Sequence, residues 1–408
     1  MHCRHCHNDL KHVFLDLGFA PPSNAYLSLD ELRKPEVYYP LKLYVCEECW
    51  LVQTEDYAQA EDLFSRDYAY FSSTSKSWLQ HAARYCDQVI SRFGLGPEHF
   101  VIEVAANDGY LLKNFVARNI PCLGVEPTDS TANAAEQLGV PILREFFGTQ
   151  CAQQLAREGR CADLILGNNV YAHVPDINDF TAGLRDVLNP EGVITLEFPH
   201  LMQLIELNQF DTVYHEHFSY LSLNTVCRLF ERAGLRVFDV ELLPTHGGSL
   251  RVYGCHTGSR HQEKAAVAEL LEKEAAHGLQ SLETYHAFQP RADKVKNDLL
   301  AFLIEQKRQG RKVAAYGAAA KGNTLLNYAG VKPDLLLYVC DAAPSKQNKY
   351  LPGSHIPVLQ PDVIAMRQPD VVLILPWNIR EEVMQQLENV RTWGGHFAIA
   401  VPALQILE

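Results

Sequence analysis

Four cysteines in two short pairs have the residue type and spacing of a metal site. Cys3 and Cys6 form one CxxC pair, and Cys46 and Cys49 form the other. Four thiolates are the number that a tetrahedral structural zinc requires, and each pair can chelate from one tight turn. Because all four ligand positions are filled, the pattern predicts a structural zinc. Ordinary buried or redox thiols are the alternative, and three histidines are rival ligands: His2, His5 and His7.

A second chemical stretch is the run YHEHFSY at residues 214–220, which places two histidines, a glutamate and two tyrosines within seven residues. An imidazole takes up a proton near neutral pH, and a tyrosine hydroxyl can donate to an enolate oxygen. The run is not HExxH, so the helical zinc-protease arrangement is excluded, and the spacing of His215 and His217 gives a metal site only weak support. By residue type alone, a structural histidine cluster fits as well as a catalytic one.

Downstream of this run, His246 and Arg251 frame a Gly-Gly turn in the sequence THGGSLR. Polar loops of this kind commonly face a ligand. A simple hairpin turn also explains the pattern, so both side chains are candidate ligand contacts only.

A third candidate site is the loop at residues 105–109 together with Glu126. Both follow short apolar runs that predict buried strands, at 100–104 and 122–125. In such a pair the loop lets an adenosine group approach the backbone, and the acid accepts hydrogen bonds from both ribose hydroxyls. The alternative is that Glu126 is an ordinary acid at a strand end.

The residue types of this loop favour one class of ligand. Ala105 stands where the fingerprint GxGxxG commonly has a glycine, and a pyrophosphate needs the closest approach to the backbone. S-adenosylmethionine carries no phosphate, so the loop fits this methyl donor better than a dinucleotide. Asn107 and Asp108 would then meet its amino-acid end, and Glu103 is either a positioning group or a buried, hydrogen-bonded acid.

A second small-residue loop, at residues 317–323, carries Lys321 between Gly317 and Gly322. Backbone N–H groups, the dipole of a predicted helix and an ammonium group together make a diphosphate site. A plain turn with a solvent-exposed lysine is the alternative. Asp341, at the end of the next predicted strand, imitates the fingerprint of NAD enzymes, so a dehydrogenase is a rival interpretation.

Alternating strands and helices must position these groups. Short apolar runs and helical stretches alternate twice after the cysteine-bearing N-terminal part, with a charged helical stretch at 262–309 between the two units. We therefore expect an α/β protein with a zinc-binding N-terminal module and two Rossmann-like units built on doubly wound parallel sheets. Further strands are predicted at 162–166, 192–198, 312–316, 335–340 and 370–375, and helices at 77–92, 110–118 and 180–188.

The composition excludes several classes of protein. A chain of 408 residues is too long for one ordinary core, and 47% hydrophobic with 21% charged residues is typical of a globular protein. A net charge of -13 opposes binding to nucleic acid and to anionic membranes. The N-terminus lacks the apolar core of a signal peptide and no apolar stretch is long enough to span a bilayer, so we expect a cytoplasmic protein whose 11 cysteines are reduced thiols or metal ligands.

In chain order, the motifs resemble those of one enzyme family. The two CxxC pairs are followed by EVAANDGYLL, GVEP, NNVYAHVPD, EFPH, YHEHFSYLS, THGGSLRVY, AYGAAAKGNTLLNY and PGSHIPV. This set resembles the S-adenosylmethionine-dependent C-methyltransferases of deoxysugar biosynthesis, over essentially the whole chain. YHEHFSY and GAAAKGN are the most specific parts, because ordinary methyltransferases lack them. Ala105 and Ala106 depart from the glycine or serine that is often found in the donor loop.

The resemblance implies three domains: a zinc-binding domain at 1–75, a methyltransferase domain at 76–255 and a Rossmann-like sugar-nucleotide-binding domain at 256–408. It also implies S-adenosylmethionine and a structural zinc as cofactors, with the four cysteines as zinc ligands. The substrate would be a sugar nucleotide, usually dTDP-linked in this family. Family members are often monomeric, so we expect a monomer or weak oligomer without nucleic-acid or membrane partners.

The residue patterns and the resemblance together assign side chains to the two ligands. Contacts to the methyl donor are expected from Glu103, Ala105, Asn107, Asp108, Gly109, Glu126 and Asn168. Contacts to the sugar nucleotide are expected from Tyr68, Tyr70, His173, His246, Arg251, Gly317, Lys321 and Asn323. By resemblance, the second histidine of YHEHFSY, His217, is the base, assisted by Tyr214 and Glu216.

Family members typically methylate C3 of a 4-keto-6-deoxy sugar. A proton beside a ketone is acidic enough for an imidazole to remove if the enolate is stabilised. His217 would take this proton, Tyr214 would donate to the 4-keto oxygen, and Glu216 would orient the imidazole. The alternatives are an NAD-dependent sugar-nucleotide oxidoreductase, an O- or N-methyltransferase acting on a sugar nucleotide, and a zinc-containing assembly or regulatory protein.

Overall fold

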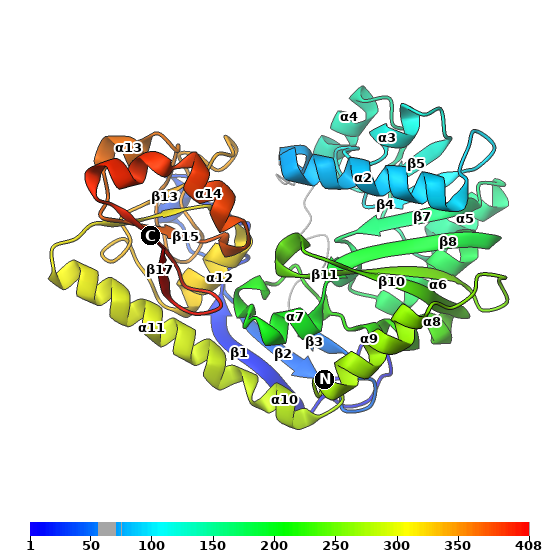
Figure 1. The fold of residues 1–408 in the computed structure, drawn as a ribbon, viewed down its shortest axis with the longest axis horizontal. Coiled ribbons are helices and arrows are strands. Elements are labelled where there is room, and N and C mark those ends of the chain that lie inside the picture. The colour runs from blue at the N-terminus through cyan, green and yellow to red at the C-terminus, as the bar shows by residue number, and fades with distance from the viewer. Residues whose placement is uncertain (56–70, 75, 408) are drawn as a thin grey trace.

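The computed structural model describes residues 1–55, 71–74 and 76–407, whose strands form three sheets in two lobes (Figure 1). The first sheet is antiparallel, in the order β1-β2-β3-β9. Its strands are β1 (His12–Ala20), β2 (Tyr39–Val45), β3 (Val52–Thr54) and β9 (Ser219–Tyr220). Since β9 belongs to the YHEHFSY run, a segment from the middle of the chain completes the sheet of the N-terminal module.

The second sheet forms the expected central Rossmann-like unit, in the order β10-β11-β8-β7-β4-β5-β6. The strands are β4 (Val101–Val104), β5 (Cys122–Val125), β6 (Ile142–Leu143), β7 (Ala162–Asn168), β8 (Leu188–Pro199), β10 (Leu235–Leu243) and β11 (Ser249–His256). The five from β8 to β6 are parallel, and β11 is antiparallel to both of its neighbours. The chain moves from β4 outward to β6 and resumes at β7, so the switch point where such sheets bind ligands lies between β4 and β7.

Helices cover both faces of this sheet. One face packs on α2 (Lys76–Phe93), α3 (Lys113–Val116) and α4 (Asp129–Gln137), and the other on α5 (Thr149–Arg157), α6 (Ile177–Val187) and α8 (Leu223–Ala233). A short helix, α7 (Leu201–Glu206), follows β8. The helix expected at 110–118 is only the four residues of α3, because tight turns flank it and Asn119 has a φ of 56°.

The C-terminal part forms the second Rossmann-like unit, whose sheet runs in the order β14-β13-β12-β15-β16-β17. Its strands are β12 (Val313–Tyr316), β13 (Val339–Cys340), β14 (Val358–Leu359), β15 (Val371–Ile374), β16 (His396–Ile399) and β17 (Gln405–Leu407). Only β17 is antiparallel to its neighbour. The helices are α9 (Ala265–Ala276), α10 (Leu282–His286), α11 (Phe288–Arg308), α12 (Ala320–Tyr328), α13 (Val363–Arg367) and α14 (Arg380–Gln386).

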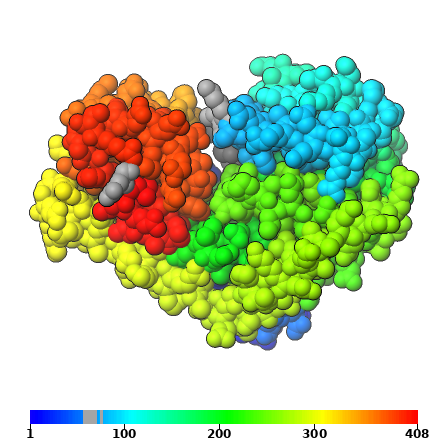
Figure 2. Space-filling model, in the orientation of Figure 1, coloured from blue at the N-terminus to red at the C-terminus, as the bar shows by residue number. Residues whose placement is uncertain are grey.

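One hydrophobic core joins the N-terminal sheet to the C-terminal unit. The ring of Phe14 in β1 stacks on Phe288 of α11 at 4.9 Å and meets the edge of Tyr285 at 5.4 Å. The two lobes meet along α11 and the N-terminal sheet, and the surface is hollowed between the C-terminal lobe and the blue α2 region (Figure 2). None of the described helices has the length and apolar content that crossing a bilayer requires.

Candidate active site and metal centre

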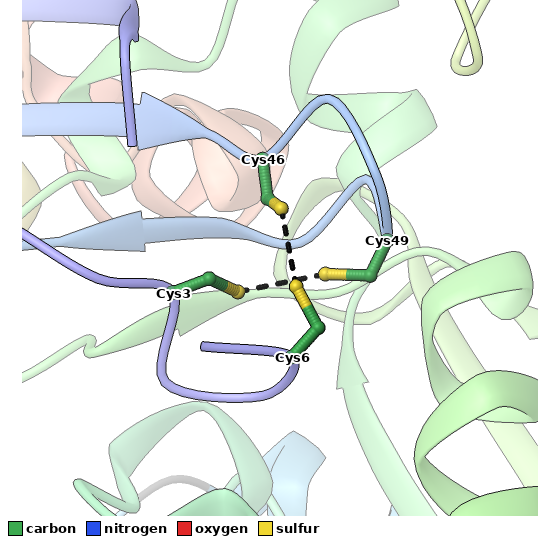
Figure 3. Close-up of side chains that lie close together, drawn as sticks. All are labelled: Cys3, Cys6, Cys46 and Cys49. Atoms are coloured by element: carbon green, nitrogen blue, oxygen red, sulfur yellow. Dashed lines mark hydrogen bonds between the residues drawn. The ribbon is translucent and has the colours of Figure 1, made fainter. Parts of the chain in front are cut away.

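The four cysteines converge on one point. Their sulfur atoms all lie within 4.8 Å of one another, with Cys3 Sγ 3.5 Å from Cys49 Sγ and Cys6 Sγ 3.4 Å from Cys46 Sγ (Figure 3). The second pair forms the turn between β2 and β3, which brings it against the N-terminal pair. Four thiolates in one cluster provide the donor type and number of a tetrahedral zinc site.

Two of the rival histidine ligands point elsewhere. His5 hydrogen-bonds through Nδ1 to Asn178 Oδ1 at 2.8 Å, and His2 pairs with Asp9 at 3.0 Å. Within the described residues, the cluster that could hold a metal consists of the four cysteines. The choice of an all-cysteine set over one containing these histidines therefore agrees with the geometry.

The loop after β4 is folded around the acid at the end of β5. Ala105 and Asn107 have positive φ angles of 56° and 49°. The backbone N–H of Asn107 donates to a carboxylate oxygen of Glu126 at 2.9 Å, and the N–H of Thr128 donates to the other oxygen at 3.0 Å. At Gly109, with a φ of 74°, a Cβ would lie 3.0 Å from the side chain of Ala135, so glycine suits both the conformation and the space.

Polar atoms without partners surround this loop at the switch point. Glu103 Oε2, Asp108 Oδ1 and both polar side-chain atoms of Asn168 are buried and have no hydrogen-bond partner among the described residues. Burial, with Asp108 and Glu126 nearby, holds the pKa of Glu103 well above its usual range. Buried polar groups normally find partners, so these atoms fit a polar ligand such as the amino-acid and ribose parts of S-adenosylmethionine.

His217 is buried and held in one tautomer. Its Nδ1 lies 3.1 Å from the carbonyl oxygen of Thr212, at the end of the short helix η4 (Phe210–Thr212). A carbonyl only accepts, so Nδ1 carries the proton and Nε2 keeps its electron pair. Burial first, and the charge of His173 second, hold the pKa of His217 well below its ordinary value. The imidazole is therefore neutral at neutral pH and able to accept a proton at Nε2.

Tyr214 lies close to this imidazole, whereas Glu216 turns away from it. The ring of Tyr214 is 4.0 Å from the His217 ring. The carboxyl group of Glu216 instead accepts a hydrogen bond from Asn24 Nδ2 at 3.0 Å, and its other oxygen has no partner among the described residues. The contact that would orient the imidazole was expected from Glu216, but the Thr212 carbonyl makes it.

His173 and His246 reach the same region from two other loops. The ring of His173 lies 4.5 Å from that of His217, and its Nδ1 donates to the carbonyl oxygen of Glu216 at 2.7 Å. His246 accepts at Nε2 from Asn169 Nδ2 at 3.1 Å. Burial lowers the pKa of both His173 and His246 to about 4, and both side chains stay partly exposed. Both are therefore neutral imidazoles at neutral pH.

Arg251 faces other protein groups, in contrast to its expected ligand contact. Its buried guanidinium donates to Glu197 at 2.5 Å and to Glu241 at 2.9 Å, and lies over the ring of Tyr85. Glu197 also meets His81 Nε2 at 3.0 Å. Sequence reasoning missed this network, for which the EFPH motif containing Glu197 was the one available signal.

Protein partners fill most of the loop after β12. At Gly317, with a φ of 92°, a Cβ would lie 2.4 Å from Pro376, so only glycine fits. The backbone N–H of Ala318 donates to Asp341 at 2.7 Å, and Asn323 Nδ2 donates to the Ser23 carbonyl at 2.6 Å. These contacts leave the N–H groups of the first turn of α12 as the backbone donors of the loop.

Lys321 turns inward from this loop. Its Nζ donates to Asn378 Oδ1 at 2.8 Å and lies 4.9 Å from the centre of the Trp377 ring. This placement differs from that of a solvent-exposed lysine. Tyr68 and Tyr70, the expected sugar contacts ahead of the central sheet, lie outside the described residues.

Comparison with known proteins covers the whole chain. Three family models match in succession: a zinc binding domain at residues 3–64, a methyltransferase domain at 78–240 and a C-methyltransferase C-terminal domain at 244–402. The C-methyltransferase NovU of Streptomyces niveus is 33% identical over 405 residues, which cover 99% of this chain and 96% of that protein.

Solved structures resemble the chain over part of its length. Magnesium protoporphyrin IX methyltransferase (ChlM) from Synechocystis PCC 6803 with bound SAM is 13% identical, with a TM-score of 0.35 over 50% of this chain and 100% of that one. A complex of the Haloferax volcanii Trm112 methyltransferase activator with a methyltransferase is 11% identical, with a TM-score of 0.37 over 44% of this chain and 92% of that one.

Proposed function

The chain belongs to the family of C-methyltransferases with a zinc-binding domain, and from this premise we propose its substrate and mechanism. It is an S-adenosylmethionine-dependent C-methyltransferase with a structural zinc site. We propose that it methylates a dTDP-linked 4-keto-6-deoxy sugar at C3, by way of an enolate. The hydrogen bond from His217 Nδ1 to Thr212 carries this proposal, because it leaves a neutral base in a buried site.

In the proposed reaction, His217 Nε2 takes the proton from the carbon beside the carbonyl, and the C–H electron pair forms the enolate. Tyr214 donates a hydrogen bond to the carbonyl oxygen as the negative charge develops. S-adenosylmethionine, when bound, supplies an electrophilic methyl group, and the C–CH₃ bond forms as the S–CH₃ bond breaks. The proton on His217 then leaves to solvent, which restores the neutral imidazole.

The remaining assignments are proposals in the same sense. We propose that domain boundaries fall at 1–75, 76–255 and 256–408, and that the protein acts as a monomer or weak oligomer. The donor would be held by Glu103, Ala105, Asn107, Asp108, Gly109, Glu126 and Asn168. Support comes from the unpartnered polar atoms at the switch point and from the position of Glu126 at the end of β5.

The test is to incubate the protein with a dTDP-4-keto-6-deoxyhexose and S-adenosylmethionine and to follow the sugar nucleotide by mass spectrometry and NMR. We expect a gain of one methyl group on carbon, and a fall in rate of about 100-fold or more for His217→Ala. His277→Ala, at the exposed end of α9, is the control and should keep the wild-type rate. Methylation on oxygen or nitrogen, or an undiminished rate for His217→Ala, would contradict the proposal.

A further inference from the structure

Lys321 occupies an unusual position for a lysine in a strand-to-helix loop. It lies in the first turn of α12, a helix on the side of the C-terminal lobe that faces the central domain (Figure 1). The side chain is only partly exposed, and its ammonium donates a hydrogen bond to the amide of Asn378 and lies against the face of Trp377. Among the described residues, no carboxylate lies within ion-pair distance of this ammonium. Asp211 is the acid that interacts with this charge from beyond that distance, and burial lowers the pKa of Lys321.

The Trp377 ring connects this ammonium to the site of the proposed base. Its Nε1 donates to Asp211 at 2.8 Å, and Asp211 precedes Thr212, whose carbonyl holds His217. On the other side, a Cβ at Gly247 would lie 2.5 Å from the Trp377 ring, so the turn that carries His246 packs directly on the indole.

A second contact fixes α12 against Val213, the residue just before the YHEHFSY run. Thr324, one turn after Lys321, donates from its hydroxyl to the carbonyl oxygen of Val213 at 2.7 Å. Both contacts place the Lys321 ammonium beside the segments that bear His217 and His246. The electrostatics agree, since the positive charge of Lys321 is one cause of the lowered pKa of each imidazole, after burial.

We propose that Lys321 is a catalytic residue, whose ammonium stabilises the negative charge that develops on the substrate carbonyl oxygen when His217 removes the neighbouring proton. This inference rests on the proposed function and reassigns Lys321 from the diphosphate to the reacting end of the sugar. A fixed cation next to a developing oxyanion stabilises the transition state more than the neutral ketone. The same cation opposes charging of the imidazole, so the carbonyl oxygen must lie closer to Nζ than His217 does.

Protein groups already occupy part of this loop. The Ala318 N–H is taken by Asp341, and the Ala318 carbonyl accepts from Tyr26 at 2.5 Å and from Lys346 at 2.8 Å. The first N–H groups of α12, whose N-cap Ala319 provides no side-chain hydrogen bond, could still meet an anion, but the Lys321 side chain lies against Trp377. The enolate role uses the observed direction of the Lys321 side chain, toward Asn378 and Trp377.

The experiment separates the two roles of Lys321. Lys321→Met is compared with wild type in two measurements: the rate of methyl transfer at saturating sugar nucleotide and methyl donor, and the dissociation constant of dTDP by calorimetry. We expect the saturated rate to fall about 100-fold or more and the dTDP dissociation constant to change less than threefold. Lys332→Met is the matched control, because this exposed lysine lies beyond the end of α12 and donates to the Gly353 carbonyl, and it should match wild type in both.

A tenfold or greater loss of dTDP affinity in Lys321→Met would overturn the inference, whatever happens to the rate. A saturated rate within threefold of wild type would also overturn it. If Lys321→Met does not fold, Asn378→Ala removes the hydrogen bond that positions the ammonium, and the rate should fall about tenfold with unchanged dTDP affinity. Absence of methyl transfer by the wild-type protein would instead refute the proposed function.

Discussion

Thr54 of the zinc-bearing hairpin holds the backbone of His217. Its hydroxyl donates to the His217 carbonyl at 3.4 Å, and its backbone N–H donates to the carbonyl of Phe218 at 3.2 Å. In the same ladder, Val52 of β3 lies opposite Tyr220 of β9. The CxxC turn precedes β3, so a single short strand connects the zinc site with the proposed base. We therefore expect loss of the metal to disturb the backbone that carries His217.

Removing the metal should impair catalysis more than donor binding. The switch point between β4 and β7 belongs to another sheet, whereas β9 depends on the hairpin that the cysteines close. We expect Cys46→Ser, or chelation, to lower the methyl-transfer rate at least tenfold and to leave the dissociation constant of S-adenosylmethionine within about threefold. Zinc content and donor calorimetry are measured on the same sample. A zinc-free protein with full activity would disprove this coupling.

Glu126 should contribute strongly to binding of the methyl donor. Its carboxylate shapes the loop through Asn107 and Thr128 and can still accept from ribose hydroxyls. Each hydrogen bond to a charged group contributes roughly 1.5–3 kcal/mol, so Glu126→Ala should weaken donor binding about 10- to 100-fold or more. Glu136→Ala, which removes an exposed acid paired with Arg144, serves as the control. Equal affinities of the two variants, measured by calorimetry, would refute the role of Glu126.

The pH profile should report the environment of His217. The base acts in its neutral form, so kcat/KM falls as the pH drops through its pKa, which burial and His173 hold well below 6.5. Burial lowers the pKa of His173 to about 4, so its charge opposes the imidazolium of His217 only in acid; His173→Phe removes this charge, so the pKa of His217 should rise and the acidic limb should move to higher pH. Lys321 and His246 act in the same direction as His173 and stay in place in this variant. An acidic limb that moves to lower pH would contradict this interpretation.

We expect Asn24, a loop residue of the N-terminal module, to support the reaction by holding the side chain of Glu216. Burial raises the pKa of Glu216, and Asn24 donates to one of its oxygens, so a proton on this carboxyl group resides on the other, unpartnered oxygen. Asn24→Ala removes the hydrogen bond that fixes Glu216, whose backbone carbonyl accepts from His173 beside His217, and should lower kcat/KM about tenfold without changing donor affinity. The measurement is steady-state kinetics with donor calorimetry, and Asn189→Ala, far from Glu216 at the start of β8, is the comparison. Equal kcat/KM values for the two variants would exclude a role for Asn24.

Local sequence patterns predicted much of this fold, because the strands and helices concerned depend mainly on residues that are adjacent in the sequence. The apolar run at 122–125 coincides with β5, and the helix predicted at 77–92 is α2 with one more residue at each end. Two CxxC pairs sufficed for the metal cluster, since chelation by a tight turn depends on spacing alone. The strand predicted at 335–340 is shorter, because only Val339 and Cys340 pair with β12.

Contacts between distant segments could not be predicted from one sequence. Nothing in the periodicity of YHEHFSY indicates that Tyr220 pairs with Val52, because the partner is 168 residues away in the chain. The Lys321 side chain is directed by Trp377, which arrives from another strand end, so its loop alone suggested a diphosphate contact. The pairing of Arg251 with Glu197 likewise becomes apparent only once β8 and β11 are known to be adjacent. Such pairings follow from tertiary packing, which no local pattern encodes.

The most direct test of the central claim is solvent hydrogen exchange at the carbon beside the carbonyl. A dTDP-4-keto-6-deoxyhexose is incubated in D₂O with the protein and S-adenosylhomocysteine, so that an enolate can form but no methyl group is transferred. NMR should show deuterium entering at C3 with wild-type protein and no enzyme-dependent entry with His217→Ala. Equal exchange by both proteins, or C3 methylation without His217, would contradict the account.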